Sequence, residues 1–203
     1  MGISPVLWQF LVKWLHSSAL FPAEASTIAP YTDALYFFLV GISLVGLVFV
    51  AAFAPAEGET LGEVENGSKD SVLGTALVQY TYPAGPGGET AVEFAINPAM
   101  IREAFAADLP AETTALMAAT QRPAAAAAFT DASGPPAWKR LPCWAVVATG
   151  DKAAGTDVVR AQAQRAGADI IEVEGSHVIM ISQPQAVTDH ILKAYQAVAA
   201  SAR

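Results

Sequence analysis

The chain has 203 residues, and its 11 Lys and Arg against 19 Asp and Glu give a formal net charge of −8. This acidic balance argues against nucleic-acid binding, which needs clustered positive charge, and against docking on an anionic membrane surface. Hydrophobic residues make up 53% of the chain and Cys143 is its single cysteine, which excludes a disordered tail and a disulfide-stapled or cysteine-rich zinc protein.

The N-terminal region is almost uncharged, and its apolar run from Ala34 to Ala54 allows two interpretations. As one helix the run would span about 31 Å, so residues 31–54 would anchor the chain in a membrane. Alternatively, residues 47–53 form a buried parallel strand closed by Pro55, which leaves too few apolar residues before it to cross a bilayer. The chain is then either membrane-associated or cytoplasmic.

The middle of the chain predicts a loop, a hairpin and short helices. Residues 55–75 are acidic and contain glycines, which is typical of a surface loop. Residues 76–82 and 91–96 flank a turn rich in Pro and Gly, which predicts a β-hairpin. Proline signals open three predicted helices, at 98–107, 111–120 and 123–129.

The last third alternates between strands and helices. Its strands are predicted at 143–150 and 169–174, and its helices at 157–166 and from Pro184 to about Ala200, with Ser182 as N-cap. The final helix carries a predicted buried stripe of Val187, Ile191, Tyr195 and Val198. Strand–helix–strand–helix at this spacing predicts an α/β fold with a parallel sheet.

Two polar residues follow the carboxyl ends of these strands, where open parallel sheets bind ligands. Asp151 comes directly after the strand at 143–150, and His177 follows the strand at 169–174 after a Gly-Ser turn. A carboxylate beside an imidazole fixes the tautomer of the ring and stabilises its cation. We therefore expect Asp151 and His177 to lie within hydrogen-bond reach, as the acid and base of a nucleophilic triad.

From about Gly46 onward the chain resembles the C-terminal part of small bacterial α/β-hydrolases of the esterase type, relatives of plant methyl esterases and hydroxynitrile lyases. The segments that carry the resemblance are LVFVAAFAPAEGET, FAADLP with TQRPAAAAAF, PPAWKRLPCWAVVATGD and GADIIEVEGSHVIMISQP. The resemblance implies a partial α/β-hydrolase domain at 46–203, with a small helical lid at about 60–137. It implies Asp151 as triad acid, His177 as base, a small apolar ester-like substrate, and no metal or organic cofactor.

The nucleophile is the point of departure from that family, which places a serine in a G-x-S-x-G turn before the strand matching 47–53. Here Ser43 is the candidate, but Val45 stands where the motif has its last glycine. Only residues 44–46 separate Ser43 from the strand, too few for the helix that follows the serine in the family. We therefore expect a truncated hydrolase, without its early strands and oxyanion loop, whose own ester hydrolysis is impaired.

Residues 1–45 resemble a different family. The segment FPAEASTIAPYTDALYFFLVGIS is similar to the entry of the first transmembrane helix of cytochrome oxidase subunit II. A chain whose one cysteine is Cys143 cannot build the copper site of that family. The alternative function is therefore a membrane-anchored, non-catalytic fusion fragment with an apolar helical segment at 1–45.

The remaining candidate side chains have structural explanations. His190 lies beside the stripe of the last helix and His16 flanks an apolar helix, so neither is assigned to the site. A turn accounts for Ser176 and a helix cap for Ser182, whereas Cys143 is expected to be buried. Trp138 and Trp144 are expected in the core or the lid.

Overall fold

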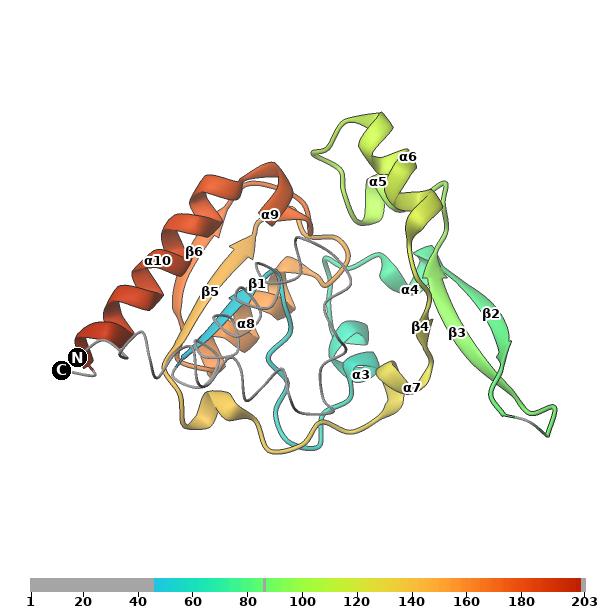
Figure 1. Cartoon of the computed structure of the whole chain (residues 1–203), viewed down its shortest axis with the longest axis horizontal. Coiled ribbons are helices and arrows are strands. Elements are labelled where there is room, and N and C mark those ends of the chain that lie inside the picture. Colours follow the sequence, from blue (N-terminus) through green and yellow to red (C-terminus); the bar gives the residue numbers. More distant parts are fainter. Residues whose placement is uncertain (1–45, 86, 202–203) are drawn as a thin grey trace, which may run out of the picture. The chain divides into compact units, whose positions relative to one another are not determined.

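The computed structural model describes residues 46–85 and 87–201, which fall within one compact unit, Val45–Arg203 (Figure 1). Its strands are β1 (Leu47–Val50), β2 (Leu77–Pro83), β3 (Thr90–Ile96), β4 (Ala124–Ala125), β5 (Cys143–Ala148) and β6 (Asp169–Val173). Its helices are α3 (Leu61–Asn66), α4 (Leu73–Ala76), α5 (Ile101–Ala104), α6 (Ala111–Thr120), α7 (Ala127–Thr130), α8 (Thr156–Arg165), α9 (Ile179–Ser182) and α10 (Pro184–Ser201). The segment 1–45, with Ser43 and His16, lies outside the described residues.

The first sheet is parallel and has the order β1-β5-β6. Leu47 pairs with Cys143 and Val50 with Val146, so the predicted parallel pairing with the strand at 143–150 is confirmed, but the strand predicted over 47–53 ends at Val50. The competing prediction of one unbroken helix over 34–54 is wrong, because residues 47–50 are extended and bonded to β5. None of the helices in the described part of the chain combines the length and apolar character that crossing a bilayer requires.

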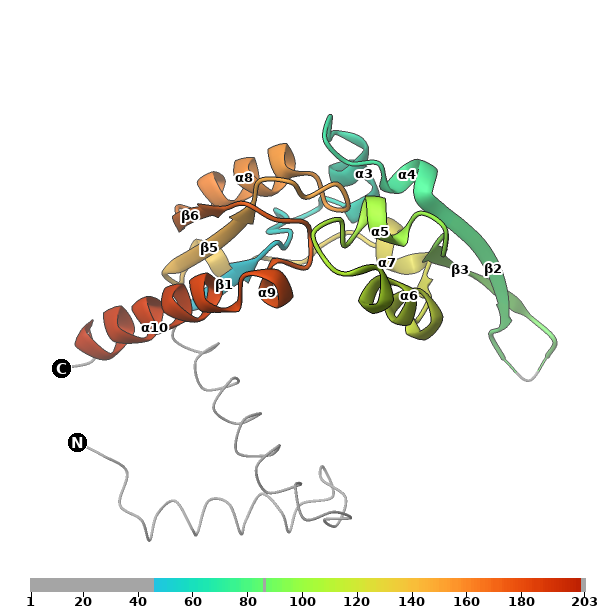
Figure 2. The ribbon, with the colours of Figure 1, turned by 90° about the horizontal axis from the view of Figure 1, so that it is seen from above.

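Strand β5 is buried along its whole length, and its alternate residues belong to two apolar clusters. Val146 and Ala148 pack in a cluster with Ile179 and Val187, from α9 and α10. On the other face of the sheet, the alternate residues of β5 pack against α8: this cluster contains Ala145, Val147, Val159 and Ala163. Figure 2 shows α8 and α10 on opposite faces of the sheet, the arrangement expected of a βαβα unit.

Helix α10 buries a slightly different stripe from the predicted one. Its buried residues are Val187, His190 and Ala194, which recur at i, i+3 and i+7 on one helical face. Tyr195, predicted to be buried, is 49% exposed, because the small Ala194 faces the core in its place. Ser182, the predicted N-cap of this helix, is instead the last residue of α9.

The second sheet is antiparallel and has the order β2-β3-β4. Strands β2 and β3 form the predicted hairpin, with Leu77 opposite Ile96. The predicted helix at 123–129 is wrong in its first half, because Ala124 and Ala125 pair with the free edge of β3 and only α7 is helical. The predicted helix at 98–107 shrinks to α5, whereas the one at 111–120 is confirmed as α6.

The predicted loop at 55–75 contains two helices, α3 and α4. Helix α3 begins with a capping box, in which Thr60 Oγ1 accepts from Glu63 N at 3.2 Å and Glu63 Oε2 accepts from Thr60 N at 3.2 Å. The T-x-x-E pattern that produces such a box is visible in the sequence. The chain leaves the parallel sheet after β1 and returns to it at β5. The elements between these strands, from α3 to α7 and including the second sheet, are called the second layer (Figure 1).

Candidate active site

The candidate site is built at the carboxyl edge of the parallel sheet. Asp151 follows β5 and is 1% exposed. Its Oδ1 accepts hydrogen bonds from the backbone N–H groups of Ala153 and Ala154, each at 2.9 Å. The Thr156 hydroxyl accepts from Asp151 N at 3.1 Å and donates to Ala148 O at 2.8 Å. These bonds fix the carboxylate and leave its Oδ2 directed at the turn that follows β6.

His177 reaches the same edge from the turn after β6. Gly150 N donates to Gly175 O at 2.9 Å, which ties the turn after β5 to the turn after β6. A Cβ atom on Gly175 would lie 2.7 Å from Asp108 Oδ2 and would also overlap Ile179 Cδ1, so a side chain here would displace both of these neighbours. The close approach of these segments sets the position of the imidazole.

Nδ1 of His177 lies 2.9 Å from Oδ2 of Asp151, as the sequence predicts for the two residues. The His177 side chain is 25% exposed, whereas the Asp151 side chain is 1% exposed. A carboxylate accepts, so this contact places the proton on Nδ1 and the lone pair on Nε2. The Phe105 ring covers the imidazole with a centroid distance of 5.0 Å and a tilt of 41°. The arrangement can accept a proton at Nε2 and stabilise the resulting cation.

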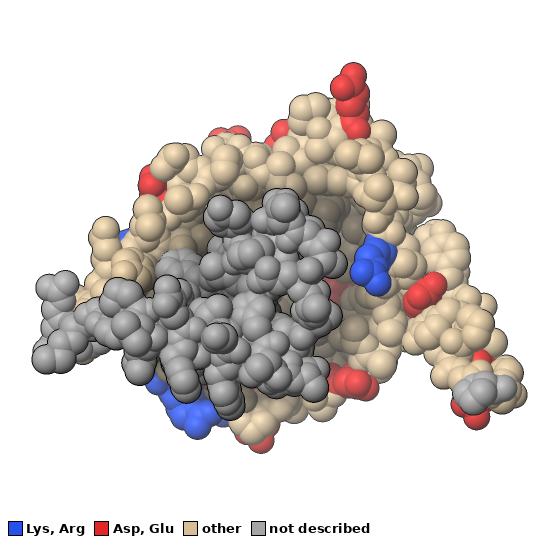
Figure 3. All heavy atoms as spheres, viewed as in Figure 1, with Lys and Arg blue, Asp and Glu red and all other residues tan. Residues whose placement is uncertain are grey.

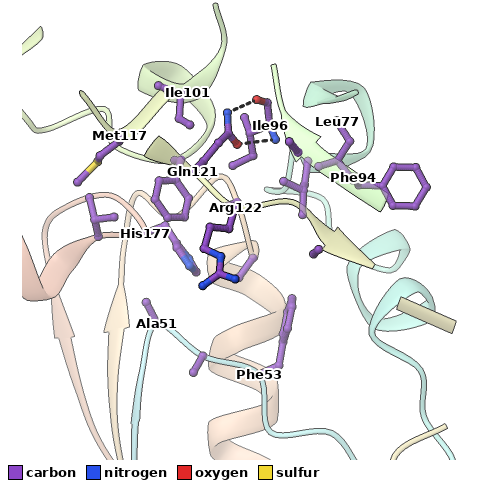
Figure 4. A pocket seen from close by; sticks show the side chains of 18 of the residues that line it. Ala51, Phe53, Leu77, Phe94, Ile96, Ile101, Met117, Gln121, Arg122 and His177 are labelled. Atoms are coloured by element: carbon purple, nitrogen blue, oxygen red, sulfur yellow. Dashed lines mark hydrogen bonds between the residues drawn. The ribbon is translucent and has the colours of Figure 1, made fainter. Parts of the chain in front are cut away.

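His177 opens on a cavity of about 780 Å³ between the parallel sheet and the second layer (Figure 4). Most of the described lining side chains are apolar, including Phe53, Leu77, Phe94, Ile101, Met117 and Ile181. Ala51, the residue after β1, also lines the cavity and has a φ of 44°, so the chain turns sharply there. A cavity of this size and polarity suits a small, largely apolar molecule.

The second layer is bonded to the histidine turn through Asp108. Asp108 Oδ2 accepts from Ser176 N at 3.0 Å, and its Oδ1 accepts from the Ser176 hydroxyl. Burial raises the pKa of Asp108, but the hydrogen bonds from Ser176 help to outweigh that effect, and the pKa lies below its ordinary value of 3.8. Sequence reasoning missed this contact, because no local pattern relates residue 108 to residue 176.

The other nucleophilic side chains have structural partners. The Ser176 hydroxyl is held by Asp108, away from the histidine ring. Cys143 is 5% exposed, and burial raises the pKa of its thiol. His190 Nε2 lies 3.0 Å from Asp169 O, which agrees with a structural role. Ser43, the sequence candidate for the nucleophile, lies outside the described residues.

The two tryptophans also have structural surroundings. Trp138 donates from Nε1 to Pro55 O at 2.9 Å, and the Arg165 guanidinium lies 5.7 Å from its ring centroid. Trp144 belongs to the core with 7% exposure.

Within residues 46–85 and 87–201, no cluster of three His, Cys, Asp or Glu side chains is arranged to hold a metal ion. On the face shown in Figure 3, the described Lys and Arg side chains lie at separate points.

Comparisons with solved structures give the same fold. Polyneuridine aldehyde esterase matches with a TM-score of 0.61 at 18% identity, over 90% of this chain and 76% of that one. An Arabidopsis methylesterase matches with a TM-score of 0.54 at 20% identity, over 73% of this chain and 58% of that one. Tomato methylketone synthase I, in complex with 2-tridecanone, matches with a TM-score of 0.51 at 20% identity, over 74% and 61%. The chain thus spans only about three fifths of the last two proteins.

The sequence comparison extends the hydrolase match further toward the N-terminus than expected. No curated protein matches the chain. The profile described as the alpha/beta hydrolase family matches residues 16–190, so it includes Ser43. Nothing in the comparisons supports the resemblance of residues 1–45 to cytochrome oxidase subunit II. Because the profile covers most of the sequence, the chain belongs to the alpha/beta hydrolase family.

Proposed function

We propose that the cavity binds a small apolar ester-like substrate and that His177, oriented by Asp151, occupies the position of the general base of an acyl hydrolase. The observation that carries the proposal is the 2.9 Å contact between the two side chains at the wall of the cavity. The esterase and methylesterase names of the similar structures are consistent with this chemistry. We further propose that residues 60–137 act as the lid of a hydrolase domain at 46–203, because they supply Phe105 and Met117 to the cavity.

The chemistry follows from the position of Nε2. A hydroxyl beside Nε2 would give its proton to the ring as its oxygen attacks the ester carbonyl carbon. The C–O bond to the alcohol then breaks, and the departing alkoxide takes the proton back from Nε2. Water repeats both steps on the acyl group and releases the acid. In each half-reaction, Asp151 stabilises the transient imidazolium through Nδ1–H.

Weak or absent turnover by this chain is the second part of the proposal. In the chain, β1 begins at Leu47, so only residues 44–46 separate it from Ser43. Val45 also replaces the last glycine of the nucleophile motif, in which the serine sits on a sharp strand-to-helix turn. We infer that Ser43 is not presented to Nε2 as a working nucleophile, although the base and its orienting acid are in place.

The binding half is tested with a ligand that cannot be hydrolysed. We expect 2-heptanone, a neutral ketone, to shift the NMR signals of the His177 ring saturably. The ring of His190 is an internal control, because it is 3% exposed and does not line the cavity. His177→Ala assigns the signals. A titration that leaves the His177 signals unchanged, or that moves both rings equally, would refute binding in this cavity.

A further inference from the structure

The apolar cavity contains one feature that the proposed acyl chemistry leaves unused, the guanidinium of Arg122. Arg122 is the only described lining residue whose side chain is charged throughout the physiological pH range. No Asp or Glu is among the described lining residues, and none forms an ion pair with Arg122 in the described part of the chain. Figure 4 shows the side chain extending from the second layer into the cavity that His177 also enters.

The backbone that carries Arg122 is held on both sides. Gln121 Oε1 accepts from Ile96 N at 3.0 Å, and Gln121 Nε2 donates to Ile96 O at 2.8 Å, which clamps the end of α6 to the end of β3. Pro123 follows, and the residue before a proline is restricted to extended conformations. Ala124 then pairs with Phe94 in the second sheet. The backbone of Arg122 is therefore held in a fixed frame, which reduces the backbone entropy lost when a ligand binds.

We propose that Arg122 binds a carboxylate on the substrate, so that the cavity selects small acyl compounds with one anionic end. Arg122 is exposed, and guanidinium groups pair with carboxylates through two parallel hydrogen bonds. The substrate class is then a short carboxylic acid that carries its ester group toward His177, such as a half-ester of a dicarboxylic acid. This assignment rests on the proposed function of the same cavity.

The test compares two probes that differ mainly in charge, hexanoate and hexanamide. Their dissociation constants are measured with the full chain by the same titration of the His177 ring. We expect hexanoate to bind about tenfold more tightly than hexanamide, a ratio near the lower limit for hydrogen bonds to charged groups. In Arg122→Gln the ratio should fall to about one, and Arg122→Lys should keep part of the preference, because it keeps the charge but loses the bidentate geometry.

Arg102→Gln is the matched control. Arg102 is an exposed arginine of α5 in the same layer, and it does not line the cavity. Its removal changes the net charge equally and should leave the tenfold ratio intact. Equal affinity for the two probes in the unaltered chain, or a ratio that survives in Arg122→Gln, overturns the inference while the cavity still binds ligands. If 2-heptanone and both probes fail to bind, the proposed function itself is refuted, and this assignment with it.

Discussion

Asp108 accepts two hydrogen bonds from Ser176, the residue immediately before His177, one from its backbone N–H and one from its hydroxyl. Asp108 lies between α5 and α6, whereas Ser176 follows β6 of the parallel sheet. The contact therefore connects the second layer to the turn that carries the histidine. We expect movement of the proposed lid to disturb the histidine turn through this carboxylate.

Replacing Asp108 should loosen the histidine turn without unfolding the sheet. In Asp108→Ala the backbone N–H of Ser176 loses its acceptor, so we expect faster hydrogen exchange at residues 175–178. Asp131→Ala is the control, because Asp131 is an exposed aspartate of the same layer without a described side-chain partner. Unchanged exchange at the turn in Asp108→Ala would show that the contact does not hold the loop.

The same carboxylate predicts a dependence of stability on pH. Because the pKa of Asp108 is lowered on folding, its contribution to the free energy of unfolding is complete above the unfolded value of 3.8. The contribution disappears as the pH falls through the lower folded pKa. Urea unfolding should thus show a difference between the unaltered chain and Asp108→Asn that shrinks from pH 6 to pH 3. A difference that stays constant would rule out this linkage.

Gly175→Ala tests the close packing behind the site. The new Cβ would meet Asp108 Oδ2 at 2.7 Å and overlap Ile179, so atoms on two sides must move. Overpacking of this kind costs about 1–3 kcal/mol of unfolding free energy. Gly134→Ala is the matched control, because nothing lies within 4 Å of a Cβ at that position. Equal unfolding free energies for the two variants would contradict the packing described here.

Asp151→Asn should change the protonation of the histidine ring. In the unaltered chain the carboxylate favours the proton on Nδ1, whereas an amide can donate to that nitrogen and favour the other tautomer. The ¹⁵N shifts of the His177 ring report which nitrogen carries the proton, and those of His190 should stay unchanged. A His177 ring with identical shifts in both proteins would mean that Asp151 does not orient it.

Thr60→Ala tests the capping box that begins α3. The Thr60 hydroxyl accepts from Glu63 N at 3.2 Å, and its loss leaves a donor of the first turn without this partner. Loss of an N-cap costs about 1 kcal/mol of stability, measured by urea unfolding. Thr75→Ala provides a comparison, since the Thr75 hydroxyl only donates to the backbone oxygen of Val72 within its own turn. A cost no larger than that of Thr75→Ala would argue against the box.

The features predicted correctly from the sequence are those that depend on short patterns of neighbouring residues. The parallel pairing of 47–50 with β5 follows from a short run of apolar residues, and the proximity of Asp151 and His177 follows from their places after two neighbouring strands. The hairpin and α6 were likewise marked by turn residues and by a proline.

The features that sequence reasoning missed depend on distant partners. Residues 124–125 are part of an alanine run that favours a helix, yet they pair with the open edge of β3. The Asp108 contact with Ser176 spans 68 positions in the sequence. The place of Arg122 in the cavity likewise depends on how α6 and β3 are clamped together. None of these arrangements has a local pattern that identifies it.

The most direct test of the central claim is the reaction of the purified chain with a fluorophosphonate, which labels serine nucleophiles that a histidine activates. The account predicts no stoichiometric labelling, and p-nitrophenyl butyrate hydrolysis at the background rate in the unaltered chain, His177→Ala and Ser43→Ala alike. Ser201→Ala serves as the control for a serine outside the site. Stoichiometric labelling that persists in Ser201→Ala and disappears in Ser43→Ala would contradict the account, because it would show a working nucleophile at Ser43.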